Sequence, residues 1–227
     1  MKLSVILPVY NEERTVRECV ERTLAVPVDL ELIVVNDGST DGTPGILSSM
    51  NGHGSRLKLI HADRNRGKGA AIRLGLQHVT GDIVIIQDAD LEYDCHEYPK
   101  MLVPFNDDAT QVVYGSRFLG KIEQMRWLNR FANRFFTWLA NLLFRGRITD
   151  EATCYKAFRT PLLKELDLKC RRFEFCPEVT AKVLRRGIEI KEVPISYKGR
   201  THEEGKKIGW RDGWMVIYTL LRYRFFE

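Results

Sequence analysis

Short apolar runs alternate with amphipathic segments over the first half of the chain. The apolar runs are rich in Val, Ile and Leu, and they cover Leu3–Val9, Leu32–Val35, Leu57–Ile60 and Ile83–Ile86. Because their hydrophobicity is continuous rather than alternating, they predict strands covered on both faces, as in a parallel sheet. The segments between them have helical spacing: Glu12–Leu24, a stretch through Ile46 with Thr40 or Asp41 as its N-cap, and Gly69–Val79. This order predicts a doubly wound, mostly parallel α/β sheet with flanking helices.

The second half of the chain is more mixed. Further strands are predicted over Gln111–Tyr114, Cys154–Phe158 and Glu189–Tyr197. Helices are predicted over Ile122–Phe144, over Glu178–Arg186 with Gly187 as its stop, and over Trp210–Phe225, and the first and last of these are amphipathic. The polar segment Gly199–Ile208 predicts a loop. No repeat or linker interrupts the pattern, so residues 1–227 are expected to form a single domain.

The composition is that of a folded protein, because 44% hydrophobic residues exclude a disordered chain. The five cysteines include no CxxC pair and the histidines no HxxxH or CxxH spacing, so neither a disulfide framework nor a zinc site is predicted. Reduced cysteines in a cytosolic protein are expected. The N-terminal apolar run is too short for a signal peptide. Phe135–Phe144 is about half the length of a bilayer span, so we expect no transmembrane segment.

Acidic and amide residues follow each of the four predicted strands in the first half. They are Asn11 and Glu12 after the first, Asn36, Asp37 and Asp41 after the second, Asp63 after the third, and Asp88, Asp90 and Glu92 after the fourth. Ligands of open α/β sheets bind at the carboxyl ends of the strands. Clustered carboxylates repel unless a cation compensates them, and Mg²⁺ or Mn²⁺ prefers such oxygen ligands. Each Asp could instead cap a helix or shape a turn, but four such features together favour a metal–nucleotide site.

Four motifs carry a family resemblance: PVYNE, VVNDGSTDGT, RNRGKGAA and the DAD of Asp88–Asp90. In this order they resemble a family-two glycosyltransferase with the GT-A fold. The resemblance implies a nucleotide-sugar pocket lined by Pro8, Tyr10, Glu12, Asp37 and Asp63. It also implies that Asp88 and Asp90 bind a divalent ion, Mg²⁺ or Mn²⁺, that bridges the diphosphate of the nucleotide sugar.

Two further residues are assigned to the same site with less support from the motifs. Lys68 could reach the phosphates from a helix N-terminus, or it could be a solvated turn lysine, and the sequence leaves both readings open. Glu92 follows the DAD at a spacing that would extend to the same metal, although related archaeal enzymes usually have Gln there.

The positive charge of the chain is concentrated in residues 117–147. The whole chain carries a formal charge of +5, whereas this segment has seven basic residues against the single acid Glu123. Arg126, Arg130 and Arg134 recur every four residues and form one helical stripe beside an aromatic face. An ordinary surface helix, a nucleic-acid contact and a membrane interface all fit this pattern. The aromatic and basic segment at 210–226 repeats the chemistry and favours the membrane.

The later motifs refine the resemblance. VVYGSRF, NRFAN, TDEATCYKAFR and VPISYKGR…EEGKK resemble the dolichyl-phosphate mannose synthase branch, whose members transfer a sugar to a polyprenyl phosphate. By that resemblance Arg117 and Arg130 would bind the acceptor phosphate, and Asp150 would lie near the reacting groups. Arg200 and Lys206 would close over the substrates. The QxxRW motif of processive polysaccharide synthases is absent from the sequence.

The sequence therefore predicts a metal-dependent inverting enzyme that moves a hexose from a nucleotide sugar of the GDP-mannose or UDP-glucose type to a polyprenyl phosphate. Asp90, Arg117, Arg130 and Asp150 are its predicted catalytic residues. Residues 1–120 would hold the nucleotide sugar and metal, and residues 121–227 the acceptor. The protein would lie peripherally at the cytoplasmic membrane face.

Two rival functions remain. A hydroxyl acceptor of an envelope glycan would need a carboxylate base, for which Asp150 is the candidate. A non-catalytic nucleotide or nucleic-acid-binding module is disfavoured, because the four acidic strand ends would repel a polyanion. We therefore predict no nucleic-acid partner.

Overall fold

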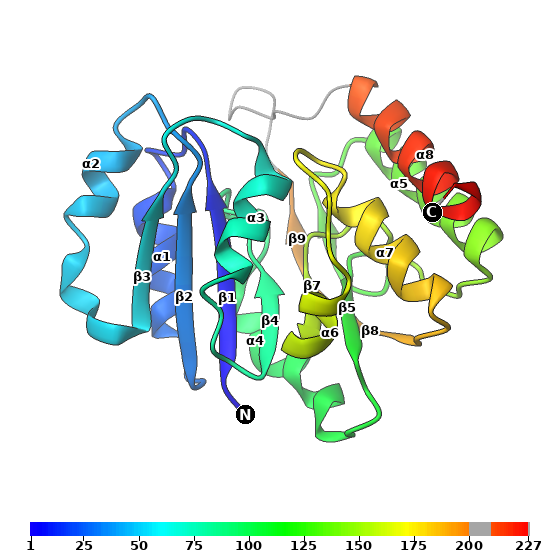
Figure 1. The fold of residues 1–227 in the computed structure, drawn as a ribbon, viewed down its shortest axis with the longest axis horizontal. Coiled ribbons are helices and arrows are strands. Elements are labelled where there is room, and N and C mark those ends of the chain that lie inside the picture. Colours follow the sequence, from blue (N-terminus) through cyan, green and yellow to red (C-terminus); the bar gives the residue numbers. More distant parts are fainter. Residues whose placement is uncertain (200–209, 227) are drawn as a thin grey trace.

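The computed structural model describes residues 1–199 and 210–226 of the chain. Its main element is a seven-stranded sheet with the order β3-β2-β1-β4-β7-β5-β8 (Figure 1). The strands are β1 (Leu3–Val9), β2 (Leu30–Asn36), β3 (Leu57–His61), β4 (Ile83–Ile86), β5 (Val112–Ser116), β7 (Lys156–Arg159) and β8 (Ile190–Pro194). All neighbours pair in parallel except β7, which is antiparallel to both β4 and β5. The predicted mostly parallel α/β sheet is confirmed.

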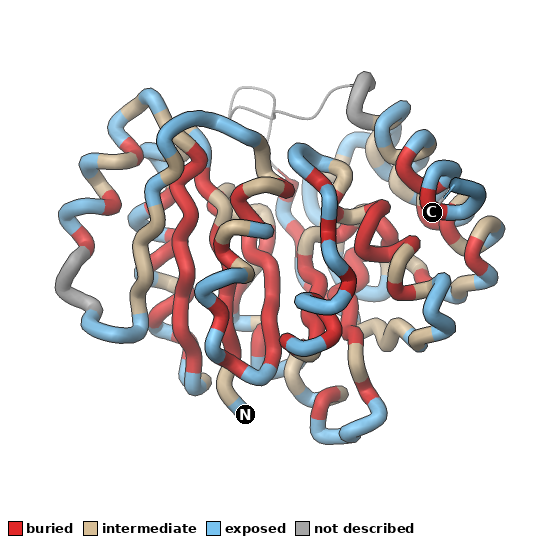
Figure 2. Tube along the Cα trace, in the orientation of Figure 1, coloured by how far each residue is buried: buried red, intermediate tan, exposed pale blue. Residues whose placement is uncertain are grey.

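Helices cover both faces of this sheet. They are α1 (Val16–Ala25), α2 (Thr43–Ser48), α3 (Lys68–Leu76), α4 (Tyr98–Leu102), α5 (Trp127–Phe144), α6 (Thr160–Glu165), α7 (Phe175–Arg185) and α8 (Trp210–Phe225). Alternate side chains of each strand enter different cores, because successive residues of a strand point to opposite faces. In β1, Val5 and Leu7 pack with α1, α2 and α4, whereas Ile6 packs with α3, α6 and α7. The central strands are accordingly buried along their length (Figure 2).

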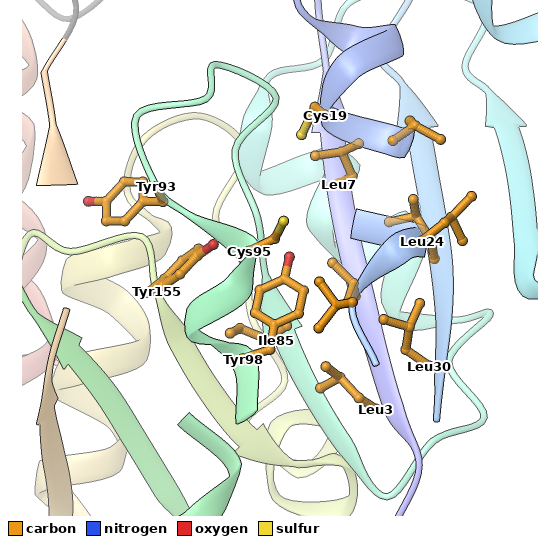
Figure 3. Packing of buried hydrophobic residues seen from close by; sticks show 14 of the residues in the cluster. Leu3, Leu7, Cys19, Leu24, Leu30, Ile85, Tyr93, Cys95, Tyr98 and Tyr155 are labelled. Carbon is orange, nitrogen blue, oxygen red and sulfur yellow. The ribbon is translucent and has the colours of Figure 1, made fainter. Parts of the chain in front are cut away.

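Two features at the margin of these cores shape the site. A group of buried tyrosines, Tyr93, Tyr98 and Tyr155, lies at the edge of the α1-side core (Figure 3). The rings of Tyr93 and Tyr155 stack with centroids 4.7 Å apart. A third cluster joins α5, α7 and α8 through Ala140, Ala181 and Leu220, so that the two amphipathic helices lie together at one end of the molecule.

The predicted helix over Ile122–Phe144 is wrong at its start. Residues Ile122–Glu123 form a short strand, β6, which pairs in parallel with β9 (Tyr197–Lys198) in a second, two-stranded sheet. Arg126 is extended, with φ −59° and ψ 139°, so α5 begins only at Trp127. Helical periodicity in the sequence did not reveal this pairing, because the partner strand lies 75 residues further along the chain.

Other boundaries also differ from the prediction. The single strand expected over Glu189–Tyr197 is divided, since β8 pairs with β5 while β9 pairs with β6. The N-cap of α2 is Gly42 rather than Thr40 or Asp41, although the Asp41 carboxylate accepts a hydrogen bond from the Thr43 amide at 3.0 Å. Helices α4 and α6 were not predicted. In contrast, β1, β4 and α8 have the predicted bounds, and Gly187, at φ 68°, follows α7 as its stop.

Candidate active site

The loops that follow β1 and β2 are joined by hydrogen bonds at the carboxyl edge of the sheet. Asn11, with φ 53°, receives the Thr40 amide on its side-chain oxygen at 2.8 Å, and its own amide donates to the Ser39 hydroxyl at 3.0 Å. The Glu12 amide donates to the Thr43 hydroxyl at 3.0 Å. The structure therefore brings the predicted residues of the first motif, Pro8, Tyr10 and Glu12, beside the NDGSTDG turn.

Asp37 supports the next loop rather than projecting alone. Its carboxylate is buried and accepts the backbone amides of Arg66 and Gly67, the latter at 2.7 Å. Gly67 has φ 96°, and a Cβ there would lie 2.5 Å from the Arg171 carbonyl oxygen, so this turn requires glycine. Asp37 and Asp63 both line a pocket of about 830 Å³ between this loop and α3, together with Arg64, Arg66, Arg73 and Arg171. The structure thus brings two of the predicted nucleotide residues to one hollow.

Lys68 is not a solvated turn lysine. It is the first residue of α3, its side chain is 16% exposed, and its ammonium lies 2.5 Å from the Asp88 carboxylate. The same ammonium donates to the Cys154 thiol at 3.1 Å. Burial lowers the pKa of Lys68, but the carboxylate of Asp88 and the Cys154 thiol more than offset this, and the net effect is a raised pKa. Lys68 therefore stays a cation beside the first Asp of the DAD motif.

The predicted metal carboxylates lie on one tight turn after β4. Leu91 has φ 60°, and the Glu92 amide donates to the Asp90 carboxylate at 3.1 Å. The Glu92 carboxylate accepts the Tyr197 hydroxyl at 2.6 Å. Asp88, Asp90 and Glu92 are not among the groups of three whose ligand atoms lie within 4.8 Å of one another in the described chain. One or two carboxylates with phosphate oxygens suffice for Mg²⁺ or Mn²⁺, so the donor set fits such an ion.

A different trio, Asp94, Cys95 and His96, does meet that distance within the described residues. Asp94 accepts hydrogen bonds from both the amide and the ring of His96, at 3.1 and 2.7 Å. This is the N-cap of a short helical turn, and it accounts for the cluster without a metal.

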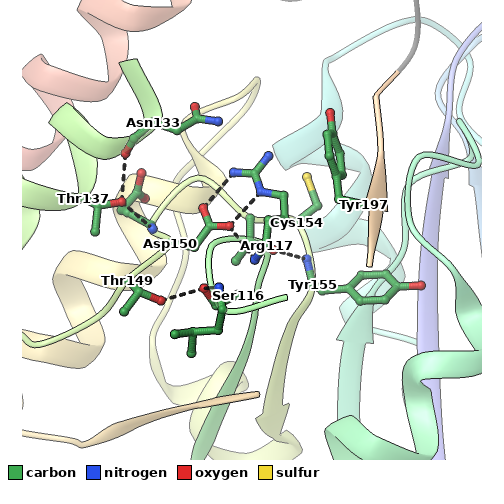
Figure 4. A network of polar contacts seen from close by, with 12 residues as sticks. Ser116, Arg117, Asn133, Thr137, Thr149, Asp150, Cys154, Tyr155 and Tyr197 are labelled. Carbon is green, nitrogen blue, oxygen red and sulfur yellow. Dashed lines mark hydrogen bonds and ion pairs between the residues drawn. The ribbon is translucent and has the colours of Figure 1, made fainter. Parts of the chain in front are cut away.

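Arg117 and Asp150 form a buried, two-pronged ion pair (Figure 4). Arg117 Nε and Nη2 each donate to one Asp150 oxygen at 2.7 Å, and the Arg117 amide adds a third bond at 3.0 Å. The Arg117 side chain is 6% exposed and that of Asp150 fully buried. Arg117 Nη1 has no hydrogen-bond partner among the described residues. The structure therefore unites two predicted residues that are 33 positions apart in sequence.

The loop that carries Asp150 is held from two sides. The Glu192 carboxylate, on β8, accepts the amides of Thr149 and Asp150, the former at 2.8 Å. On the other side, the Thr137 hydroxyl of α5 accepts the Glu151 amide at 2.9 Å. Neither Glu192 nor Thr137 was singled out from the sequence, because their partners are set by the fold and not by local spacing.

The remaining acceptor residues are placed differently. Arg130 is exposed on α5, and the residue of its stripe that packs on the Arg117 segment is Arg134, whose guanidinium lies 4.9 Å from the Phe118 ring centroid. Arg200 and Lys206 lie outside the described residues. Their predicted closing role, and the predicted acceptor role of Arg130, stay predictions.

Sequence reasoning missed the buried Glu151 carboxylate and a pair of half-buried cysteines, Cys154 and Cys176, near Asp150. Neither oxygen of the Glu151 carboxylate has a hydrogen-bond partner within the described part of the chain, and burial raises its pKa to about 8. The Cys154 thiol contacts Lys68, and the Cys176 thiol donates to the Thr153 carbonyl at 3.5 Å. Cys154 and Cys176, which the sequence indicates only as reduced cysteines, therefore lie beside the site.

Comparison of this sequence with known proteins places it in a family and identifies relatives. Residues 4–167 match the model of Glycosyl transferase family 2. The chain is 34% identical over 213 residues to the undecaprenyl-phosphate 4-deoxy-4-formamido-L-arabinose transferase of Edwardsiella ictaluri (strain 93-146), covering 90% of this chain and 62% of the relative. It is 29% identical over 225 residues to the low-salt glycan biosynthesis hexosyltransferase Agl6 of Haloferax volcanii, covering 96% and 53%. The chain thus spans less than two thirds of the length of these relatives.

The fold has solved counterparts. Glucosyl-3-phosphoglycerate synthase from Mycobacterium tuberculosis, solved with Mn²⁺, UDP and phosphoglyceric acid, superposes with a TM-score of 0.75 at 22% identity and covers 100% of this chain and 79% of its own. At this identity the likeness concerns the fold, and the fold is that of the GT-A glycosyltransferases. From the match over residues 4–167, this chain belongs to glycosyl transferase family 2.

Proposed function

We propose that this protein transfers a hexose from a nucleotide sugar to a polyprenyl phosphate with the help of a divalent metal, inverting the anomeric carbon. The observation that carries the proposal is the buried Arg117–Asp150 pair, in which Arg117 Nη1 has no hydrogen-bond partner among the described residues. Lys68, which pairs with Asp88, contacts Cys154 on the same segment as Asp150. The name of the Edwardsiella relative, an undecaprenyl-phosphate transferase, supports the same acceptor class.

The sugar-donor half would use the acidic turn after β4. Asp88 and Asp90 would hold Mg²⁺ or Mn²⁺, with Glu92 as a further ligand, and the M. tuberculosis counterpart was solved with Mn²⁺ and UDP. When bound, such an ion neutralises the charge that builds on the departing diphosphate. Lys68 adds a second positive charge at the same place. Pro8, Tyr10, Glu12, Asp37 and Asp63 would surround the nucleoside.

The acceptor half favours a phosphate over a hydroxyl. A hydroxyl acceptor needs a general base, but both oxygens of Asp150, the candidate base, already accept hydrogen bonds from Arg117. A polyprenyl phosphate is an anion before it reacts, so it needs only positioning and charge neutralisation. Arg117 would supply both through Nη1, and Arg130 would add charge at the approach.

The membrane would supply the acceptor through the faces of α5 and α8. Large apolar side chains are exposed along both helices: Trp127, Leu128, Phe131, Trp138, Leu142, Trp214, Met215, Tyr218 and Phe225. Arg126, Arg130 and Arg134 border them on α5. Aromatic and basic helical faces of this kind bind in the headgroup region of anionic membranes. None of the helices in the described part of the chain has the length and hydrophobicity of a membrane span. We propose peripheral attachment at the cytoplasmic face.

The direct test is incubation with a panel of nucleotide sugars, Mg²⁺ or Mn²⁺, and undecaprenyl phosphate, with extraction of lipid-linked sugar. We expect transfer from one donor, dependent on the metal and on the phosphate group of the lipid. Transfer to the dephosphorylated polyprenol at an equal rate would instead support a hydroxyl acceptor. Salt-sensitive oligonucleotide binding without any transfer would support a binding module.

A further inference from the structure

Tyr197 lies where the acidic turn meets the segment that carries Arg117. Its backbone forms an antiparallel bridge with Tyr93, and the next amide, that of Lys198, donates to the Glu92 carbonyl at 3.0 Å. On its other edge, the Tyr197 amide donates to the Lys121 carbonyl at 2.9 Å, where β9 pairs with β6. The short strand β9 therefore connects the turn after β4 to the segment that leads into α5.

The Tyr197 side chain makes the same connection with different chemistry. Its hydroxyl donates to the Glu92 carboxylate at 2.6 Å, while the Arg117 guanidinium lies 5.1 Å from its ring centroid. The ring also packs edge-on against Tyr93 at 5.2 Å, and only 5% of the residue is exposed.

These contacts limit the freedom of both partners. A hydrogen bond from a buried phenol fixes the rotamer of the Glu92 carboxylate, and the backbone amide of the same residue donates to Asp90. The ring face fixes the plane of the guanidinium whose Nε and Nη2 are already bound to Asp150. As a result, the direction of Arg117 Nη1 is set relative to the acidic turn.

We infer that Tyr197 is a positioning residue that couples the sugar-donor carboxylates to the acceptor arginine, by donating to Glu92 with its hydroxyl and supporting Arg117 with its ring. The inference rests on the proposed function, because it assigns Glu92 to the metal side and Arg117 to the lipid phosphate. It predicts that removing the hydroxyl alone affects only the metal side, whereas removing the ring together with the hydroxyl affects both sides.

The test compares Tyr197→Phe, which keeps the ring, with Tyr197→Leu, which removes ring and hydroxyl. We expect Tyr197→Phe to weaken Mn²⁺ binding in the presence of UDP or GDP by about tenfold, as measured by electron paramagnetic resonance of the free ion. Its KM for undecaprenyl phosphate should stay within about twofold of the unmodified value. Tyr197→Leu should show the same Mn²⁺ defect and, in addition, a KM for the lipid raised about three- to tenfold.

Tyr114→Phe is the matched control. Tyr114 is also a buried tyrosine, but its hydroxyl bonds to that of Thr180, on α7, at 3.0 Å. We expect this variant to keep the Mn²⁺ affinity and the KM of the unmodified protein. An unchanged Mn²⁺ affinity in Tyr197→Phe, or an equal loss in Tyr114→Phe, would overturn the inference. So would an unchanged lipid KM in Tyr197→Leu.

Failure of the proposed function can be told apart from failure of the coupling. If the unmodified protein transfers sugar to a hydroxyl and not to the lipid phosphate, the proposed acceptor is wrong. The Mn²⁺ comparison between Tyr197→Phe and Tyr114→Phe needs no acceptor, and it still decides whether Tyr197 supports the metal carboxylates.

Discussion

Among single side chains, Arg117 is the one whose surroundings most restrict the chemistry of the site. Burial lowers its pKa, but Tyr93 and the Asp150 carboxylate raise it more, so it remains a guanidinium cation. Two of its nitrogens orient it through Asp150, and the third faces away from that pair. An arginine held in this way recognises a phosphate by geometry as well as by charge.

We predict that Arg117→Lys raises the KM for polyprenyl phosphate about tenfold or more. Lysine keeps the charge but cannot bond to both Asp150 oxygens and to a phosphate in one plane, and a hydrogen bond between charged groups contributes about 1.5–3 kcal/mol. Steady-state kinetics with varied lipid measure this effect. The affinity for the nucleotide should not change, and a change confined to the nucleotide would show that Arg117 serves the sugar donor.

Glu151 makes stability depend on pH. Burial raises its pKa from 4.5 to about 8, so the folded protein keeps this proton at pH values where the unfolded chain has lost it. Its contribution to stability is complete below pH 4.5 and declines as the pH rises to about 8, by up to about 1.4 kcal/mol per pH unit.

Glu151→Gln should remove this decline. We expect the variant to gain melting temperature relative to the unmodified protein as the pH is raised from 5 to 8, in calorimetric scans at both pH values. The comparison uses the change with pH, because the buried amide has a desolvation cost of its own at every pH. A constant difference between the two proteins across this range would contradict the raised pKa.

Among elements, the strands were the most predictable and the paired short segments the least. Leu3–Val9 and Ile83–Ile86 were predicted at their observed bounds, because strands buried on both faces leave a continuous apolar run. Ile122–Glu123 was assigned to a helix, because nothing local marks a two-residue strand whose partner is β9. Helices α4 and α6 are short, and each begins with proline in its first turn, which a search for amphipathic periodicity does not detect.

The candidate site also had parts that could be predicted from the sequence and parts that could not. The acidic turn after β4 and the Asp37 turn were predictable, because polar residues after parallel strands meet at one edge. Arg117 and Asp150 could each be named from the family resemblance, but neither their pairing nor its buried two-pronged geometry could be. Tyr197, Glu192 and Cys154 were missed as site residues, because each acts through a residue distant in sequence.

Helix α5 makes a testable prediction about the membrane. Trp127 and Phe131 are 74% and 70% exposed on the face beside the arginine stripe. Replacing both with Ser should weaken binding to phosphatidylglycerol vesicles by at least about tenfold, because burying one large apolar side chain contributes about 1.5–3 kcal/mol. Vesicle co-sedimentation measures the change.

Val103→Ser is the control for that experiment. Val103 is also exposed, at 61%, but it lies on the short turn after α4 and not on α5 or α8. The control should bind vesicles as the unmodified protein does. Equal binding by the double variant would show that the exposed face of α5 serves another purpose.

For the molecule as a whole, metal, nucleotide and stability should be linked. A ligand that binds only the folded state at about a hundred times its dissociation constant adds about 2.7 kcal/mol to stability. We expect UDP or GDP to raise the melting temperature when Mn²⁺ is present and much less after chelation with EDTA. Differential scanning fluorimetry with a nucleotide titration measures this difference.

Asp90→Asn should abolish the metal-dependent part of that rise, while the melting temperature without ligands stays close to that of the unmodified protein. Asp94→Asn is the matched control, because Asp94 belongs to the Asp94–Cys95–His96 cluster that caps a helical turn. A full metal-dependent rise in the melting temperature of Asp90→Asn, or the loss of that rise in Asp94→Asn, would show that the metal does not bind at the DAD turn.

The reversed direction of β7 has a consequence for how such a protein can diversify. Because β7 runs against β4 and β5, the loop that enters it, and not one that leaves it, reaches the edge where the parallel strands end. That loop carries Asp150, whereas the proposed metal carboxylates follow β4. Under the proposed function, insertions or exchanges between Phe144 and Lys156 should therefore alter acceptor choice without shifting the register of any parallel strand, and we expect this entry loop to be the place where the acceptor specificity of such an enzyme changes.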